Sequence, residues 1–267
     1  MKILIINLKQ SVDRLTQQQQ QFAKLGLEFE RLESVTVNDI DETYYRNKLT
    51  QGQRILKQTE HACLLSHKKA WQYTLAHQEP ILILEDDAIL TTDLAKILQE
   101  IENANLDIDF INLEVHGRKK IVSRNPAVIL DKDFSLYRLH MDKSGAAAYI
   151  LYPSGAQKLL GRIANHLDLA DAFIHSCPNL SCLQIEPAAA VQSDRCSWYG
   201  IDFQEYRLQS MIGTIGNTLA IQPTQWQKIK LRINRIASQI HLGIRTLYAL
   251  TQGIKRDIRV NADKFIK

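Results

Sequence analysis

Cysteine is scarce in this chain of 267 residues. Its four cysteines form no C-x-x-C pair and have no pair of histidines at zinc-finger spacing; they are Cys63, Cys177, Cys182 and Cys196. Disulfide frameworks belong to small secreted domains, and this chain is too long for that class. The sequence therefore argues against a structural zinc site and a disulfide scaffold, and it predicts reduced, partly buried thiols.

Long apolar runs are also missing. No segment approaches the roughly 20 apolar residues that span a bilayer. The stretch Ile3–Ile6 is too short for a signal peptide, and it continues into Asn7-Leu8-Lys9-Gln10 without a small-residue cleavage site. We therefore expect a protein of the cytoplasm, or of the inner face of the cytoplasmic membrane.

What is present is the composition of a soluble enzyme, with 45% hydrophobic and 23% charged residues. Strand patterns alternate with helix patterns, which is typical of an α/β layer fold. The simplest division is a catalytic domain over residues 1–223 and an appendage over 224–267. The predicted strands cover residues 2–7, 28–33, 80–85, 108–113, 134–139 and 145–152, and the predicted helices begin near residues 11, 60, 93 and 153.

Two stretches between these strands carry more specific predictions. Ser11 can cap a helix that Gly26 ends, and Leu15, Phe22 and Leu25 supply its buried stripe. The glutamine tract at residues 17–21 is then interpreted as the solvent face of that helix. Residues 36–58 look irregular and are longer than a compact domain usually leaves unstructured, so they are a candidate substrate-contacting loop.

The most informative feature is the acidic cluster Glu85-Asp86-Asp87. It follows the apolar run Ile81–Leu84, which predicts a buried, parallel strand, and it precedes Ala88-Ile89-Leu90. Three charges at a strand end need a cation or hydrogen-bond donors, and ligands of open α/β sheets bind beyond the carboxyl ends of the strands. A divalent ion that holds a phosphate is the natural partner. The alternative is a set of solvated turn residues.

Four sequence blocks stand out around this cluster. They are Ile5-Ile6-Asn7-Leu8 with Ser11 and Arg14; Leu49-Thr50 with Thr59 to His67 and Trp71; Leu82 to Asp87; and Gly145 to Leu151 with Ser154-Gly155-Ala156. In order and spacing these blocks resemble glycosyltransferase family 25, the lipooligosaccharide galactosyltransferase-like enzymes, from residue 1 to about 193. Ala62 stands where the family usually has glycine, and Leu169-Ala170 replaces a proline-containing approach to an aspartate.

The resemblance implies a GT-A-like nucleotide-sugar-binding α/β/α sandwich with a metal-dependent site. By this resemblance Asp87 touches Mn²⁺ or Mg²⁺ directly, with Asp86 as a further metal ligand, and Glu85 or Asp86 faces the ribose or the sugar. Such an ion stabilises the negative charge on the departing diphosphate. Oxygen-rich sites of this kind suit both ions.

Several further residues are candidates for binding the nucleotide sugar. Asn7, followed by Leu8, sits at the end of the first strand, where its amide can meet the edge of a uracil. Arg14 can bind phosphate bidentately, or it is an exposed helix charge. The family resemblance favours donor binding by Ser66 and His67, although His67 can equally be a structural histidine. Gln192 matches a family glutamine near the donor or the metal.

An inverting transfer needs a base for the acceptor hydroxyl. Asp168 and Asp171 are three residues apart and would share a face of a helical turn, so one can be the base and the other a positioning group. Asp171 fits the family aspartate better. His175 can orient Asp171 or cap the helix end, and a helix-start aspartate is often only a cap.

The C-terminal residues 224–267 are strongly basic. They contain ten Lys or Arg and two acidic residues, a charge of +8, which leaves −4 for residues 1–223 because the whole chain carries +4. Apolar residues recur there at helical spacing, which predicts a basic amphipathic helix for an anionic membrane surface. Packing on the core or in a homodimer is the alternative. The apolar positions are Ile229, Ile233, Ile236, Ile240, Leu242, Ile244 and Leu247.

Together these features predict an inverting hexosyltransferase that moves galactose from UDP-galactose to a lipooligosaccharide or lipopolysaccharide core. Glucose is the nearest competing sugar. A phosphate-ester hydrolase would need a second set of metal carboxylates, which the sequence does not offer at convincing spacing. A nucleic-acid-binding protein is disfavoured because the basic residues alternate with aliphatic rather than aromatic side chains.

Overall fold

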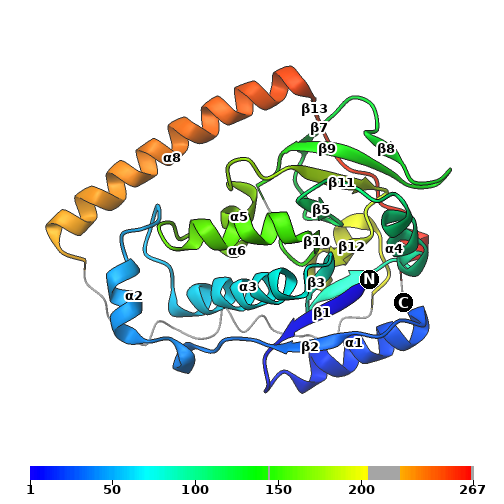
Figure 1. Cartoon of the computed structure of the whole chain (residues 1–267), viewed down its shortest axis with the longest axis horizontal. Helices are drawn as coiled ribbons and strands as arrows, with labels where there is room; N and C mark the ends of the chain where they lie inside the picture. Colours follow the sequence, from blue (N-terminus) through cyan, green and yellow to red (C-terminus); the bar gives the residue numbers. More distant parts are fainter. Residues whose placement is uncertain (144, 204–222, 266–267) are drawn as a thin grey trace.

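A mixed β-sheet forms the centre of the molecule (Figure 1). The computed structural model describes residues 1–143, 145–203 and 223–265. Within these residues the main sheet has ten strands in the order β13-β7-β9-β11-β5-β10-β3-β1-β2, with β8 beside β9. The strands are β1 Lys2–Asn7, β2 Glu30–Glu33, β3 Ile81–Glu85, β5 Phe110–Asn112, β7 Lys120–Val122, β8 Val128–Ile129, β9 Ser135–Met141, β10 Ala148–Leu151, β11 Cys182–Glu186 and β13 Ile254–Arg256.

The predicted parallel pairing of the apolar run before the acidic cluster is confirmed on one side. Strand β3 is parallel to β1, which in turn is parallel to β2, whereas the other neighbour of β3, β10, is antiparallel. A separate three-stranded sheet, β4-β12-β6, lies directly after the acidic cluster. Its strands are β4 Ala88–Leu90, β6 Glu114–Val115 and β12 Ala190–Gln192.

Helices cover both faces of the main sheet. Alternate residues of β1 enter two different cores: Ile3 and Ile5 pack in the core that contains residues of α1 and α4, while Leu4 and Ile6 pack in the core formed with α3, α5 and α6. The α/β prediction is confirmed, with helices on both sides of the sheet. The helices are α1 Val12–Leu25, α2 Glu42–Lys48, α3 Gln58–His77, α4 Leu94–Asn103, α5 Pro153–Ile163, α6 Ala170–His175 and α8 Gln225–Gln252, with short 3₁₀ turns η1 Val37–Asp39, η2 Ser193–Tyr199 and η3 Ala262–Lys264.

Helix α1 begins and ends near the predicted residues, but two details were wrong. Gly26 ends it with φ 64°, the left-handed conformation that glycine adopts without strain, as expected. The Ser11 side chain makes no capping hydrogen bond. Gln18 and Gln21 are buried rather than solvent-facing, because their amides bind backbone groups of the neighbouring strand.

The stretch 36–58 is not irregular throughout, since it contains η1 and α2. Asp41 caps α2 by accepting a hydrogen bond from the Tyr44 backbone N–H. Tyr45 is buried, and its hydroxyl donates to the carbonyl of Leu56. A helix of seven residues, about two turns, is easily missed when Tyr45 is its single buried residue.

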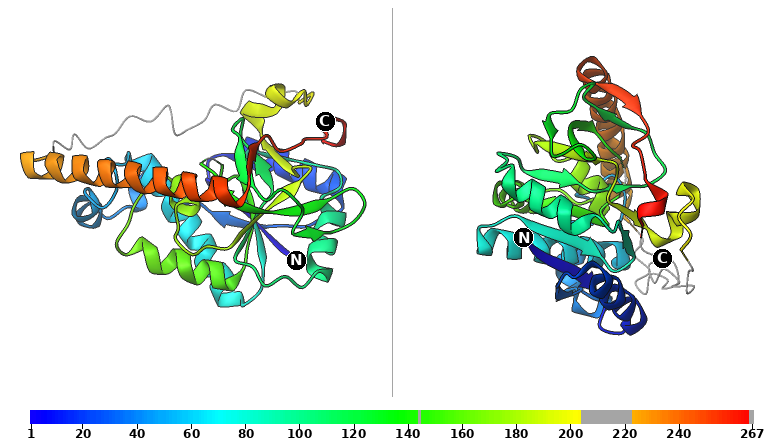
Figure 2. Two further views of the ribbon diagram at one scale, coloured as in Figure 1. Left: turned by 90° about the horizontal axis from the view of Figure 1, so that it is seen from above. Right: turned by 90° about the vertical axis from the view of Figure 1, so that its right-hand side faces the viewer.

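The predicted C-terminal helix is present as α8, but the helical segment ends at Gln252 rather than at the chain end. Thr224 caps it through a hydrogen bond to the Gln227 backbone N–H. Strand β13 then returns to the main sheet beside β7, and Ile258 and Phe265 are buried. Figures 1 and 2 show α8 running along the outside of the molecule from the β13 edge toward α2. Residues 254–265 are thus part of the folded core.

Helix α8 turns its apolar stripe away from the protein. The residues with reduced exposure on this helix include Gln227, Asn234 and Ser238, and Asn234 donates hydrogen bonds to the carbonyls of Thr50 and Gly52. The stripe residues are exposed, for example Ile233 at 60%. Among the described helices none is both long and apolar enough to cross a membrane.

Candidate active site

The acidic cluster forms the turn between β3 and β4, at the carboxyl end of the parallel pair β1 and β3. We call Glu85, Asp86 and Asp87 the acidic turn. Within it Asp86 is buried, whereas Glu85 and Asp87 are half-buried. The backbone on both sides of the turn is anchored, because β3 and β4 belong to different sheets. The prediction that this strand delivers carboxylates to a sheet end is confirmed.

Asp86 is held by hydrogen bonds to both of its carboxylate oxygens. Asn7 Nδ2 donates to Oδ2 at 2.8 Å, and Arg14 NH1 donates to Oδ1 at 2.8 Å. Burial raises the pKa of Asp86, although the positive charge of Arg14 opposes this shift. Both oxygens thus accept a hydrogen bond, and Asp86 is the counter-charge of Arg14. Its role as a further metal ligand stays a prediction.

Asn7 and Arg14 are both held next to Asp86. The Asn7 amide donates to the Ser11 carbonyl at 3.0 Å as well as to Asp86, and its oxygen accepts from Arg31 Nε at 2.9 Å. Both N–H groups of Asn7 therefore have partners within the protein, and its contact with a uracil edge stays a prediction. Arg14 is partly buried beside Asp86, not an exposed helix charge.

Two glutamines of α1 hold the backbone of the acidic turn. Gln18 Nε2 donates to the carbonyls of Asp86 and Ala88 at 3.1 and 3.0 Å, and Gln21 bonds both the Ala88 carbonyl and the Leu90 N–H. Sequence reasoning missed these positioning residues. The only sequence signal was their place on the same side of the helix as Arg14, since residues 14, 18 and 21 follow helical spacing.

Asp87 has an environment that suits a cation. Its Oδ1 is enclosed and has no hydrogen-bond partner among the described residues. Burial, followed by the carboxylates of Glu85 and Asp86, raises the pKa of Asp87 to about 8. An enclosed carboxylate oxygen beside a second acid is what an oxygen-seeking ion such as Mg²⁺ or Mn²⁺ requires. The residues present therefore fit the metal that the sequence predicts.

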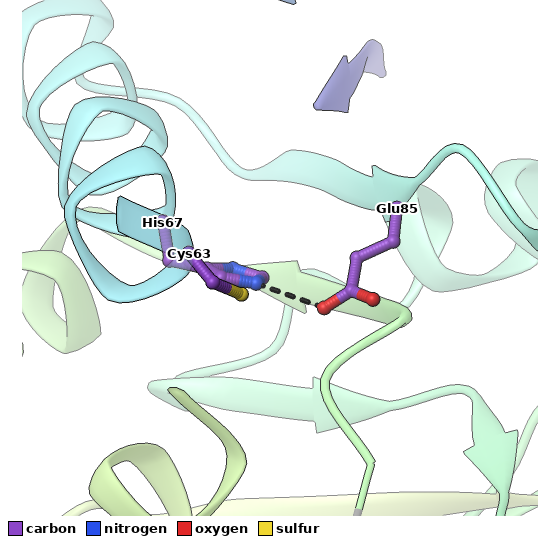
Figure 3. A group of neighbouring side chains, drawn as sticks. All are labelled: Cys63, His67 and Glu85. Atoms are coloured by element: carbon purple, nitrogen blue, oxygen red, sulfur yellow. Dashed lines mark hydrogen bonds and ion pairs between the residues drawn. The ribbon is translucent and has the colours of Figure 1, made fainter. Parts of the chain in front are cut away.

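Glu85 is linked to α3 through His67. Figure 3 shows Cys63 and His67 projecting from one face of α3 toward the Glu85 carboxylate. His67 Nε2 lies 3.0 Å from Glu85 Oε1, its Nδ1 lies 2.9 Å from the Tyr149 hydroxyl, and Trp71 Nε1 donates to that hydroxyl at 3.0 Å. Since Trp71 only donates and Glu85 only accepts, neutral His67 carries its proton on Nε2. A buried chain of donors thus ends on Glu85.

The other residues predicted to bind the donor are Gln192, Leu8 and Ser66. Gln192 ends β12 and pairs with Ala88, directly beside the acidic turn, and the Ser193 N–H donates to the Asp87 carbonyl at 2.9 Å. Leu8 is half-buried after β1. Ser66 is buried, donating to the Ala62 carbonyl and accepting from the Val35 N–H. Its hydroxyl therefore joins α3 to the segment after β2.

A second buried polar group, which sequence reasoning missed, lies next to the acidic turn. Lys120 is fully buried in β7 and contacts Asp142 at 2.6 Å, Gln184 at 2.7 Å and the Glu114 carbonyl at 2.8 Å. Glu114 accepts from the Ala147 N–H, and burial raises its pKa well above the usual value. The negative charge of Glu85 adds to that increase, so Glu114 faces the same site.

The structure separates the two predicted bases. Asp168 precedes α6, whose cap is Leu169, so the two aspartates do not share a face of one helical turn as predicted. Asp168 accepts from Gln53 at 3.0 Å and from the Leu169 N–H at 2.9 Å. Asp171 lies in the first turn of α6, where it accepts from the Ala172 N–H at 2.7 Å.

Asp171 lies close enough to the acidic turn for the charge of Glu85 to act on it. Burial raises the pKa of Asp171, and the negative charges of Glu85 and Asp168 contribute further, against the positive charge of His175. His175 lies in the last turn of α6, and its Nε2 donates to the Gly145 carbonyl at 2.8 Å. Gly145 has φ 90°, and a Cβ there would lie 2.3 Å from Glu114 Oε1, so the backbone needs glycine at this point.

Comparisons with known proteins identify the family of the chain. The sequence profile of glycosyltransferase family 25, described as an LPS biosynthesis protein family, matches residues 1–174. The chain belongs to glycosyltransferase family 25. It is 27% identical over 198 residues to a Haemophilus influenzae strain Rd protein named "Putative glycosyltransferase", covering 70% of this chain and 69% of that one. It is 26% identical over 212 residues to the H. influenzae "Lipooligosaccharide biosynthesis protein lic2B", covering 70% and 74%.

Solved structures are more distant from this family 25 enzyme. The crystal structure of A197 from STIV is 11% identical, with a TM-score of 0.38, and the match covers 73% of this chain and 92% of that one. Its family shows that the protein is a glycosyltransferase. The arrangement of its site residues is described by its own contacts.

A cavity of about 490 Å³ opens beside the candidate base in this family 25 enzyme. It lies between α6, the end of α5 and α8, and Asp168 and His175 line it together with Arg162 and Arg245. Its volume falls in the range of small-molecule sites. Burial lowers the pKa of Arg245, whose NH2 donates to the His175 carbonyl at 3.0 Å. Because Asp142 is paired with Lys120, the charged groups of the lining are predominantly positive.

Proposed function

We propose that this enzyme transfers a hexose, galactose from UDP-galactose, with inversion to a lipooligosaccharide or lipopolysaccharide core acceptor. The observation that carries the proposal is the enclosed carboxylate oxygen of Asp87 beside Glu85, which has no hydrogen-bond partner in residues 1–143, 145–203 and 223–265. Membership in family 25 and the relative named for lipooligosaccharide biosynthesis support the substrate class. Glucose remains the competing sugar, because one hydroxyl orientation distinguishes the two and a few hydrogen bonds decide it.

In this proposal Asp87 and Glu85 would hold Mn²⁺ or Mg²⁺. When bound, the ion supplies positive charge that stabilises the leaving diphosphate. Arg14, fixed by Asp86, would add a second positive charge on the same side. The site is then GT-A-like in chemistry, with the carboxylates on a turn after a parallel strand.

Asp171 is proposed as the base. Its carboxylate would take the proton of an acceptor hydroxyl while that oxygen attacks the anomeric carbon, and the bond from that carbon to the diphosphate breaks as UDP leaves. A raised pKa of Asp171 makes it a better proton acceptor than an exposed aspartate. Asp168 would instead help to bind the acceptor in the cavity beside α6.

The positive lining of that cavity suits an acceptor that carries a phosphate or a carboxylate. Replacing Arg245 with Gln should raise the acceptor KM more than it lowers kcat, because the side chain lies in the cavity wall and not at the acidic turn. An unchanged acceptor KM, measured with phosphorylated and with carboxylated acceptor fragments, would place the acceptor elsewhere.

The exposed stripe of α8 supports a peripheral position on an anionic membrane surface, where a lipid-linked acceptor would be found. Lys228, Lys230 and Arg232 flank the stripe and are exposed. Each basic residue near such a surface contributes about 1 kcal/mol to binding. The alternative is a homodimer in which two stripes pack together.

The activity itself is tested by hydrolysis and transfer assays with a panel of nucleotide sugars, with Mn²⁺, with Mg²⁺ and with saturating EDTA. We expect metal-dependent turnover of UDP-galactose. Full transfer activity in EDTA would disprove the metal requirement, and preferential turnover of UDP-glucose would replace galactose with glucose.

A further inference from the structure

A thiol, an imidazole and a carboxylate meet at the acidic turn. The candidate ligand atoms of Cys63, His67 and Glu85 all lie within 4.8 Å of one another (Figure 3). Cys63 and His67 are four residues apart on α3, so they lie on one helix face, an arrangement that also places histidine pairs on zinc. His67 is buried, and the other two are half-buried.

We propose that Cys63, His67 and Glu85 form a site for a zinc-like ion. It shares Glu85 with the Mg²⁺ or Mn²⁺ position at Asp87 but takes its other two ligands from α3. Around a tetrahedral zinc, with bonds of about 2.0–2.3 Å, neighbouring ligand atoms are roughly 3.3–3.5 Å apart. His67 Nε2 and Glu85 Oε1 already lie 3.0 Å apart. A cysteine side-chain adjustment of about 1 Å would complete the three-ligand geometry, and the fourth position would be left for water.

The surroundings favour this ion over a harder one. Thiolate and imidazole ligands select zinc-like metals over Mg²⁺ and Mn²⁺, which prefer oxygen. Asp86, Asp87 and Asp171 lie close enough to act electrostatically on Cys63, and they would favour a cation there. Tyr149, held by Trp71, can accept a hydrogen bond from His67 Nδ1, which is the usual support of a metal-bound histidine.

Zinc binding releases one proton from the protein and moves another within His67. Zinc replaces the thiol proton of Cys63, which leaves to solvent, and the proton of neutral His67 moves from Nε2 to Nδ1. Because the ion engages Glu85, it withdraws that carboxylate from the nucleotide-sugar site. Zinc should therefore inhibit transfer, a consequence that depends on the proposed function.

Cobalt tests the site directly in the full-length protein. Co²⁺ alone should produce a thiolate-to-cobalt charge-transfer band that is lost in Cys63→Ser and kept in Cys182→Ser, a half-buried cysteine on β11 that serves as control. The band should also persist in Asp87→Asn, which separates this site from the other metal position. Absence of the band in the unmodified protein, or its persistence in Cys63→Ser, would disprove the site.

Zinc affinity gives the second measurement, by competition with a chromophoric chelator. Cys63→Ser and His67→Gln should each weaken zinc binding at least about tenfold, and equal affinity would overturn the proposal. In the third measurement, micromolar Zn²⁺ should inhibit the Mn²⁺-supported reaction, and Cys63→Ser should relieve this inhibition relative to its own zinc-free rate. If no nucleotide sugar is turned over, the proposed function fails while the two binding measurements still decide the zinc site.

Discussion

The acidic turn and helix α8 show opposite relations between polarity and burial. At the acidic turn, charged and amide groups are buried, and the chain itself supplies partners from β1, α1 and β12. On α8, apolar side chains are exposed, and the side nearer the protein includes polar residues such as Asn234. The first region is organised by internal contacts, whereas the second exposes a stripe that a membrane or a second copy would cover.

Replacing Asp87 is the strongest test of the first half of this comparison. We expect Asp87→Asn to lower kcat/KM by about a thousandfold or more, because it removes the charge at the enclosed metal position. The fold should persist, since the substituted amide relieves repulsion from Glu85 and Asp86. Asp107→Asn, an exposed site near α4, is the control. Steady-state kinetics and circular dichroism measure both effects, and near-normal turnover would remove Asp87 from the mechanism.

The next largest effect should separate the two aspartates near α6. Asp171→Asn keeps the shape of the side chain but removes its basicity, so we expect kcat to fall about a hundredfold with little change in the donor KM. Asp168→Asn should act mainly on the acceptor KM, since Asp168 lines the cavity. If the two phenotypes are exchanged, Asp168 is the base.

The second half of the comparison can be tested on α8 by substitution. Deleting residues 224–267 would also remove β13 and the buried Phe265, so it cannot isolate the helix. The double change Ile233→Ser and Ile240→Ser should weaken binding to anionic vesicles at least about tenfold, since burial of each isoleucine contributes on the order of 1 kcal/mol or more.

Leu231→Ser, which is less exposed than the stripe residues, is the matched control, and vesicle binding should survive this change. Binding to vesicles should also fall steeply with salt, because surface charges are screened over about 10 Å at 0.1 M. Sedimentation with vesicles, together with light scattering, distinguishes a membrane from a dimer. A dimer that the double change dissociates, without vesicle binding by the unmodified protein, would assign the stripe to a second copy.

A smaller effect should follow when the side chain of Gln18, which holds the backbone of the acidic turn, is removed. Gln18→Ala removes two hydrogen bonds to backbone carbonyls, so metal affinity should fall by up to about tenfold and the free energy of unfolding by about 1–3 kcal/mol. Gln19→Ala changes an exposed glutamine of the same tract and should alter neither. Isothermal titration with Mn²⁺ and urea unfolding measure the two quantities. Identical effects of both variants would contradict a specific role of Gln18 in holding the acidic turn.

The stability of the metal-free protein should also depend on pH. The folded pKa of Asp87 is about 8, above its unfolded value, so between about pH 4 and pH 8 the native state keeps a proton that the unfolded chain has lost. The Asp87 contribution to the free energy of unfolding therefore falls as pH rises through this window. Asp87→Asn should flatten the profile, and Mn²⁺ should restore stability only in the unmodified protein. Thermal melts in EDTA check both statements.

Much of this site was predictable because its signals are local. Ile81–Leu84 can form only a buried segment, so the charges after it had to emerge at a strand end. Gly26 and the stripe of α1 likewise determined one helix boundary. In contrast, Gln18, Lys120 and Glu114 look like ordinary surface residues in the sequence. Gln18 bonds Ala88, 70 positions away, and Lys120 bonds Gln184, 64 positions away. Their burial therefore depends on contacts with distant segments.

The sequence by itself therefore determined the α/β class, the acidic turn and the basic amphipathic helix, since each depends on neighbouring residues and on hydrophobic periodicity. Tertiary structure alone decided that Asp86 is paired with Arg14, that Asp171 lies near enough to Glu85 for their charges to interact, and that the α8 stripe points outward. The physical reason is that burial and charge pairing depend on contacts between distant segments. A local pattern specifies which residues share a face, but it does not specify what that face meets.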